Sequence, residues 1–265
     1  MQRKILESMS ISHSCIKYIR SLDQKKVRRI DKVFLAEGPK IVSDLLGTFH
    51  CRMLVSTDDW LKAHPNALAD EVFCVTSEEL SRASLLRTPQ QVLAVFSQPT
   101  YSFDISLPQQ SLCLALDGVQ DPGNLGTIIR VADWFGIEHI FCSMDTVEVY
   151  NPKVVQATMG AIARVKTYYT SLKDFISQIP DVPVYGTFLD GDNIYNESLS
   201  TNGLIIMGNE GNGISEEIAS LVNKRLFIPN YPIGRPTSES LNVAIATSII
   251  CAEFRRKVFG LELIV

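Results

Sequence analysis

From residue 112 onward, short apolar stretches alternate with segments of helical periodicity. The apolar stretches, which are expected to be strands, lie at 112–116, 139–143, 183–189, 203–208 and 225–229. The expected helices lie at 124–135, 151–165, 171–179 and 242–258, with a further one starting near 215. Apolar strands that alternate with helices are typical of a parallel sheet covered on both faces. The sequence therefore predicts an α/β fold for this half of the chain.

A change of composition divides the chain. Only Gly38 and Gly47 precede residue 111, although the chain has 15 glycines. Residues 97–111 are polar and contain two prolines, which indicates a linker. The earlier segment has the pattern of a small α/β module, with strands expected at 33–36, 52–56, 72–75 and 92–96 and helices at 38–46 and 77–83. We therefore expect an N-terminal domain over residues 1–105 and a second domain over residues 106–265.

Three irregular loops, 117–130, 208–215 and 229–242, follow predicted strands. In a parallel sheet these loops lie at the carboxyl edge, where ligands bind. Glycines in two of them would allow the backbone to approach a ligand closely. Neither glycine loop matches a phosphate-binding fingerprint, as a Rossmann-type nucleotide enzyme would require, and Glu210 would repel a pyrophosphate. The three loops together therefore favour a binding site over loops that are only tight turns. Its ligand is expected to be cationic or rich in hydroxyl groups.

Arg130 interrupts the otherwise apolar helix 124–135, for which Asn124 is the expected N-cap. It shares a helix face with Thr127 and Trp134, away from the apolar stripe. A surface arginine or an ion pair is the simplest interpretation. Near the mouth of the sheet, however, a planar and permanently charged guanidinium is suited to a phosphate or a developing oxyanion.

The net charge of −4 does not indicate a nucleic-acid-binding protein. Residues 17–32, however, contain seven basic and two acidic side chains. Such a basic segment can bind a phosphate backbone, although a solvated helix face is the alternative. The side chains expected to contact RNA are Lys25, Lys26, Arg28 and Arg29.

The six cysteines are widely spaced and form no CxxC pair, and the four histidines are scattered. This pattern favours reduced core thiols over a zinc site or a disulfide framework, so no metal is expected. No apolar run is long enough to span a bilayer, and the first residues lack the apolar centre of a signal peptide. We therefore expect a cytoplasmic protein without membrane contact.

Taken together, the three loops resemble the motifs of the SpoU (TrmH-like) branch of the SPOUT RNA methyltransferases. The first motif, NxGxxxR, matches Asn124, Gly126 and Arg130, and the second, GxEGxG, matches Gly208, Glu210, Gly211 and Gly213. The third matches Ile228, Pro229, Gly234, Ser240, Leu241, Asn242 and Val243. The stretch VFLAEGPKIV at 33–42 resembles the family's RNA substrate-binding domain, which is L30e-like.

The resemblance implies a catalytic domain with a trefoil knot, an exception to the general absence of knots. It also implies a homodimer that uses S-adenosylmethionine. The residues that would bind this cofactor are Gly208, Gly211, Gly213, Ile228, Pro229, Ser240 and Leu241. Those that would surround the reacting hydroxyl are Arg130, Asn124, Glu210 and Asn242.

Two features depart from the family pattern. The loop 229–241 is longer than usual, with Pro232 and Pro236 added. Gln156 stands where many relatives have an arginine, so one expected contact with RNA is missing. The resemblance implies methyl transfer from S-adenosylmethionine to a ribose 2′-hydroxyl, with ribosomal RNA as the first candidate substrate. Transfer RNA as the substrate, or an inactive RNA-binding protein of the same fold, are the alternatives.

Overall fold

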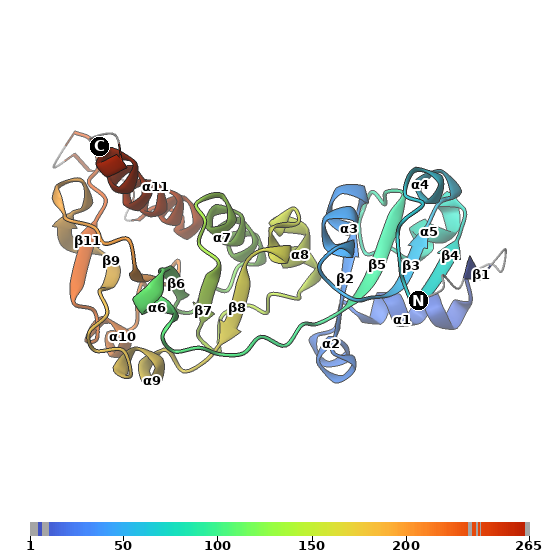
Figure 1. Cartoon of the computed structure of the whole chain (residues 1–265), viewed down its shortest axis with the longest axis horizontal. Coiled ribbons are helices and arrows are strands. Elements are labelled where there is room, and N and C mark those ends of the chain that lie inside the picture. The colour runs from blue at the N-terminus through green and yellow to red at the C-terminus, as the bar shows by residue number, and fades with distance from the viewer. Residues whose placement is uncertain (1–4, 7–10, 233–234, 237, 239, 263–265) are drawn as a thin grey trace. The chain divides into compact units, whose positions relative to one another are not determined.

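The structure is a computed structural model that describes residues 5–6, 11–232, 235–236, 238 and 240–262. It contains two compact units (Figure 1). The first unit comprises residues up to 100 together with 148–163, and the second comprises 101–147 and 164 onward. The sequence did not lead us to expect segment 148–163 in the first unit. The predicted domain boundary after residue 105 stays a prediction.

The second unit contains a six-stranded sheet in the order β11-β9-β10-β6-β7-β8. Its strands are β6 (Leu112–Leu116), β7 (His139–Cys142), β8 (Lys166–Tyr169), β9 (Val184–Asn193), β10 (Gly203–Met207) and β11 (Lys224–Phe227). Every neighbouring pair is parallel, which confirms the predicted parallel sheet. Strand β8 was not predicted, because KTYY is half polar and lacks the apolar run used to identify the other strands. The trefoil knot stays a prediction.

Helices cover both faces of this sheet. They are α6 (Leu107–Gln110), α7 (Pro122–Trp134), α9 (Leu172–Ser177), α10 (Glu216–Ala219) and α11 (Val243–Glu262), with a 3₁₀ turn at Ile194–Asn196. Helices α7 and α11 lie together on one side of the strands, and α9 and α10 lie on the other (Figure 1). Strand β6 is buried along its whole length, and Cys113 and Ala115 share a core with Phe175 of α9. Burial on both faces explains why the strand is apolar throughout.

The first unit contains a mixed five-stranded sheet in the order β1-β4-β3-β5-β2. Its strands are β1 (Ile5–Leu6), β2 (Val33–Glu37), β3 (Cys51–Ser56), β4 (Glu71–Cys74) and β5 (Val92–Ser97). Strand β5 is antiparallel to both β2 and β3, whereas β3 is parallel to β4. The small α/β module predicted from the sequence is therefore present.

The helices of the first unit are α1 (His13–Ser21), α2 (Lys25–Asp31), α3 (Pro39–Leu46), α4 (Asp58–Ala63), α5 (Ser77–Ala83) and α8 (Pro152–Thr158), followed by a 3₁₀ turn at Ala161–Ala163. Helix α5 starts where predicted and has a capping box, in which Thr76 and Glu79 bond each other's backbone N–H groups. One face of the sheet packs on α1 and α5 through Ile19, Leu80 and Val95.

Three predicted helix boundaries and one linker were inaccurate. Helix α7 starts at Pro122 and is capped by Asp121, whose carboxylate accepts from the Asn124 N–H at 2.8 Å. Asn124 is therefore not the N-cap, and its side chain is available for other contacts. Helix α11 continues to Glu262 instead of ending near residue 258.

Helix α8 ends at Thr158 instead of continuing to residue 165. Met159 and Gly160 both have positive φ angles, of 52° and 95°, which end the helix. A side chain at Gly160 would collide with Asp44, so this glycine allows the chain to approach α3.

The stretch predicted as a linker is only partly one. Tyr101, Ile105 and Leu107 pack against the core of the second unit, and Leu107–Gln110 forms α6. No helix in the described part of the chain is both long and apolar enough to cross a membrane.

Candidate functional site

The loops after β6 and β10 lie side by side at the carboxyl edge of the second unit's sheet. The two strands are neighbours in register, with Leu116 opposite Met207. The Asp117 carboxylate accepts from the Ser215 N–H at 2.8 Å, and the Asn209 amide donates to the Gly118 carbonyl at 2.7 Å. The expectation that these two loops meet is confirmed.

The loop 208–215 is closed by its own hydrogen bonds. The Asn209 side-chain oxygen accepts from Gly211 N at 2.9 Å, and two backbone bonds of 2.9 and 3.0 Å join Asn209 to Gly213. Gly213 has φ of 69°, a conformation that favours glycine. A β-carbon at Gly208 would overlap the backbone of Gly213 and Ile214. The shape of the loop thus requires glycine at positions 208 and 213, whereas a β-carbon at Gly211 would make only an ordinary contact.

Three side chains from the three loops form a hydrogen-bonded chain. The Asn124 amide donates to Glu210 Oε1 at 2.7 Å, and the Asn242 amide donates to Asn124 Oδ1 at 2.9 Å. Asn242 Oδ1 in turn accepts from Ala244 N at 3.0 Å at the start of α11, which fixes the orientation of its amide. The structure therefore brings together three of the four residues predicted to surround the reacting hydroxyl.

Arg130, the fourth predicted residue, lies on α7 between one and two turns after Asn124. Its side chain is exposed, whereas Gly126, Ile128 and Ile129 are buried. No residue that the structure describes forms a hydrogen bond or an ion pair with its guanidinium. Arg130 is therefore a surface cation that is free to bind an anionic substrate.

A cavity of about 540 Å³ lies beside this chain of side chains. Among the predicted cofactor residues, it is lined by Gly208, Gly211, Gly213, Ile228, Ser240 and Leu241, and Glu210 also reaches it. Pro229 does not line the cavity, and Gly234 lies outside the described residues. The second and third predicted loops therefore share one cavity.

Sequence reasoning missed a further wall of this cavity, which consists of Thr187, Phe188 and Leu189. These residues lie on β9, which continues to Asn193, well past its pairing with β10 at Val184–Gly186. The sequence could have indicated this wall, because Phe188 and Leu189 are apolar residues at the carboxyl end of a predicted strand.

The cavity fits S-adenosylmethionine. Its volume is typical of small-molecule sites, which span about 300–1,000 Å³. Apolar side chains such as Phe188, Leu226 and Val243 can contact a purine ring, and the neighbouring loop backbone offers polar groups. Glu210 suits ribose hydroxyls or a cationic centre and would disfavour a pyrophosphate.

The basic segment of the first unit is only partly exposed. Lys25, Lys26 and Arg29 lie on α2 with exposed side chains. Arg28, in contrast, is 1% exposed and pairs with the Glu148 carboxylate at 2.7 Å. The prediction that Arg28 contacts RNA is corrected, because its guanidinium is already occupied inside the unit.

Four of the six cysteines are buried, and all six are free thiols. Burial raises the pKa of Cys113 to about 11 and that of Cys251 to about 12. Since the thiolate is the reactive form, these groups are unreactive at neutral pH and act as small apolar core residues.

Comparison with known proteins agrees with this geometry. The model of the SpoU rRNA Methylase family matches residues 111–252, and the model of the MRM3-like substrate binding domain matches residues 13–94. A 23S rRNA (guanosine(2553)-2′-O)-methyltransferase, RlmP of Bacillus subtilis, is 30% identical and aligns over 93% of this chain and 98% of its own.

Two solved structures are similar over nearly the whole chain. One is a protein from Porphyromonas gingivalis assigned to the TrmH family of RNA methyltransferases, with 42% identity, a TM-score of 0.85 and coverage of 94% of this chain and 100% of that chain. The other is an AdoMet-bound rRNA methyltransferase from Sinorhizobium meliloti, with 31% identity, a TM-score of 0.82 and coverage of 96% and 98%.

Proposed function

The chain belongs to the SpoU rRNA methylase family, and from this we infer that it methylates a ribose 2′-hydroxyl of ribosomal RNA. The cofactor is S-adenosylmethionine, which is bound in the similar structure from Sinorhizobium meliloti. One observation carries the proposal, the chain of hydrogen bonds from Glu210 through Asn124 to Asn242 at the edge of a cavity of suitable size. A binding protein without activity would not need this arrangement.

The cofactor is held mainly by backbone groups of two loops in this proposal. The binding residues are those of the predicted set that line the cavity: Gly208, Gly211, Gly213, Ile228, Ser240 and Leu241. The bound cofactor supplies an electrophilic methyl group on a sulfonium ion. Because Gly208 has no side chain, its backbone can lie directly against that of Gly213 and Ile214, which gives the loop the shape that borders the cavity.

Arg130 stabilises the charge that develops on the ribose oxygen and binds the adjacent phosphate. A guanidinium stays charged in proteins and presents N–H groups only, so it acts as a hydrogen-bond donor. Its exposure and lack of a partner among the described residues leave it available for this role. Asn124, Glu210 and Asn242 orient the hydroxyl group.

The active form is a homodimer that assembles through the second unit. Helix α11 buries Val243, Ile250 and Phe254 but leaves Ile245 52% exposed and Ile249 half-buried. A helix that is apolar on more than one face requires more than one packing partner. We also propose that the protein acts in the cytoplasm. Light scattering at micromolar concentration should show the dimer, and a monomer would contradict it.

Isothermal titration of the full chain with S-adenosylmethionine tests the proposal. Saturable binding at one site per chain is expected, and Gly208→Ala should abolish it. The absence of binding by the wild-type protein would instead support the alternative, an inactive RNA-binding protein of the same fold.

A further inference from the structure

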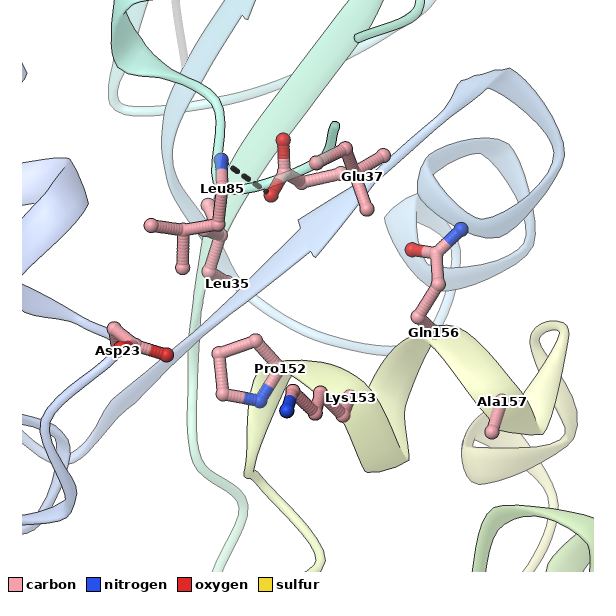
Figure 2. A pocket seen from close by; sticks show the side chains of 9 residues that line it. Asp23, Leu35, Glu37, Leu85, Pro152, Lys153, Gln156 and Ala157 are labelled. Atoms are coloured by element: carbon pink, nitrogen blue, oxygen red, sulfur yellow. Dashed lines mark hydrogen bonds between the residues drawn. The ribbon is translucent and has the colours of Figure 1, made fainter. Parts of the chain in front are cut away.

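A second cavity, of about 360 Å³, lies in the first unit (Figure 2). Strand β2 and the segment after α5 form one wall through Leu35, Leu85 and Leu86, and α8 forms the other through Pro152 and Ala157. Four polar side chains, Asp23, Glu37, Lys153 and Gln156, complete its lining. Apolar walls with a few polar groups are typical of a binding site for a small, partly apolar ligand.

Both walls of this cavity are held in place by contacts within the first unit. The buried Arg28–Glu148 ion pair and the stacked rings of Phe34 and Tyr150, with centroids 5.0 Å apart, fix the segment that leads into α8. The same Arg28 guanidinium donates to the Asp23 backbone oxygen at 2.8 Å. One buried arginine therefore holds both the backbone at Asp23 and the segment before α8. These contacts form the cavity without any ligand.

The two carboxylates of the cavity differ in what they can still bind. Glu37 is buried and accepts hydrogen bonds from the Ser84 hydroxyl and from Leu85 N, so it holds the wall in place. Burial raises the pKa of Glu37, and these two bonds partly oppose the shift. The Asp23 carboxylate, in contrast, has no hydrogen-bond partner among the described residues. It is the group that is available to a ligand.

One exposed cation, Lys153, lines the cavity, and others follow its lining residues in the sequence. Asp23 is followed by the exposed Lys25 and Lys26, and Leu86 is followed by the exposed Arg87. Exposed cations in and next to these segments suit the phosphate backbone of RNA, while a free carboxylate in the lining would repel a phosphate. Phosphate contacts position a nucleic acid, and contacts to base edges specify its sequence.

We propose that this cavity binds one unpaired base of the RNA substrate, with guanine preferred, and that the Asp23 carboxylate accepts hydrogen bonds from the edge of that base. The proposal rests on the proposed function, because it assigns to the methylated RNA a second point of recognition outside the catalytic cavity. Proteins read RNA sequence mainly through unpaired bases whose edges are exposed.

The preference for guanine follows from the chemistry of a carboxylate, which only accepts hydrogen bonds when ionised. Guanine presents a ring N–H and an exocyclic amine side by side, which match the two oxygens of Asp23. Adenine and cytosine present an amine beside an acceptor nitrogen. Uracil presents one N–H between two carbonyl oxygens, which the carboxylate would repel.

Fluorescence anisotropy with short oligonucleotides and the full chain tests the proposal. The probes are a heptauridylate and the same oligonucleotide with one central guanosine. The wild-type protein should bind the guanosine probe about tenfold more tightly, the usual discrimination of a bidentate base contact. Asp23→Asn should remove this preference, because its amide replaces one acceptor oxygen by a donor NH2 group and no longer matches two N–H groups side by side. Asp59→Asn, an equal charge change at an exposed position on α4, should retain it.

Equal affinities of the wild-type protein for the two probes, or an unchanged preference in Asp23→Asn, would overturn the proposal. The proposed methyl transfer fails through a different measurement, since it requires S-adenosylmethionine to bind to the second unit. Titration of Asp23→Asn with that cofactor should therefore give the wild-type affinity.

Discussion

The two cavities of this protein are formed by different parts of the chain. The cavity in the second unit is bordered by loops that follow strands, and its shape depends on glycine and on backbone hydrogen bonds. The cavity in the first unit lies among side chains of regular elements, which a buried ion pair holds together. Backbone groups suit a cofactor that is the same for a whole family, whereas side chains can vary with the RNA to be recognised.

This difference has a practical consequence. Changes at the glycine loops should abolish cofactor binding or chemistry, and changes around the first unit's cavity should alter stability or RNA binding without touching the chemistry. Variants in the two units can therefore test whether cofactor binding and chemistry belong to the second unit and RNA binding to the first. Variants in the second unit should have the larger effects.

Gly208→Ala should have the largest effect. Its β-carbon would overlap the backbone of Gly213 and Ile214, so the loop cannot close and cofactor binding should be lost. Gly47→Ala is the control, because nothing lies within 4 Å of its β-carbon and it belongs to the first unit, outside the cofactor cavity. Isothermal titration with S-adenosylmethionine compares them, and similar affinities would show that loop shape does not govern the site.

Arg130→Ala should lower the single-turnover rate of methyl transfer by about 10²- to 10³-fold, the usual loss for one oxyanion donor. Arg130→Lys should also be impaired, since an ammonium cannot bridge phosphate and oxygen as a planar guanidinium can. Cofactor affinity should not change, because Arg130 does not line the cavity. A rate within a few-fold of wild type would assign Arg130 to the protein surface alone.

Arg28→Ala should destabilise the first unit by about 3–5 kcal/mol, because it leaves the Glu148 carboxylate without its buried partner. Arg29→Ala, at the exposed neighbouring position, should change stability by less than about 0.5 kcal/mol. Urea denaturation gives the free energy of unfolding for both. Equal values would contradict the assignment of Arg28 to the interior.

Replacing Lys25, Lys26 and Arg29 by glutamine should have the smallest effect. RNA affinity should fall, and its dependence on salt should flatten by up to about one unit of slope for each lost phosphate contact. The control is Lys40→Gln with Lys62→Gln, two exposed lysines of the same unit that pair with Asp44 and Asp58. If both sets give the wild-type slope, α2 is a solvated helix face.

The second unit was largely predictable because its signals are local. Strand β6 is buried on both faces and is apolar along its whole length, so five residues were enough to identify it. In loop 208–215, Gly208 is required by steric overlap and Gly213 by its positive φ angle, which leaves a fixed spacing of these two glycines in the sequence. In contrast, the short and half-polar β8 carries no such pattern.

The parts that were not predicted depend on contacts between distant residues. Arg28 and Arg29 look alike in the sequence, and only Arg28 is buried, where it contacts the distant Glu148 carboxylate and the Leu22 and Asp23 backbone oxygens. Asn124 is a good candidate N-cap, but Asp121 has that role, and the Asn124 amide is used by Glu210 instead. The first unit's cavity needs residues near 23, 86 and 153 to come together, which no local pattern indicates.

The most direct test of the central claim uses ribosomal RNA, purified protein and S-adenosylmethionine labelled in its methyl group. A ribose methylated at its 2′-oxygen can no longer cleave its own phosphodiester in alkali. The wild-type protein should therefore place the label in an alkali-resistant dinucleotide, and Arg130→Ala should do so about 10²- to 10³-fold more slowly. Label recovered in mononucleotides, or no label in the RNA while the cofactor is bound, would contradict the assignment of ribose 2′-O-methyl transfer to this site.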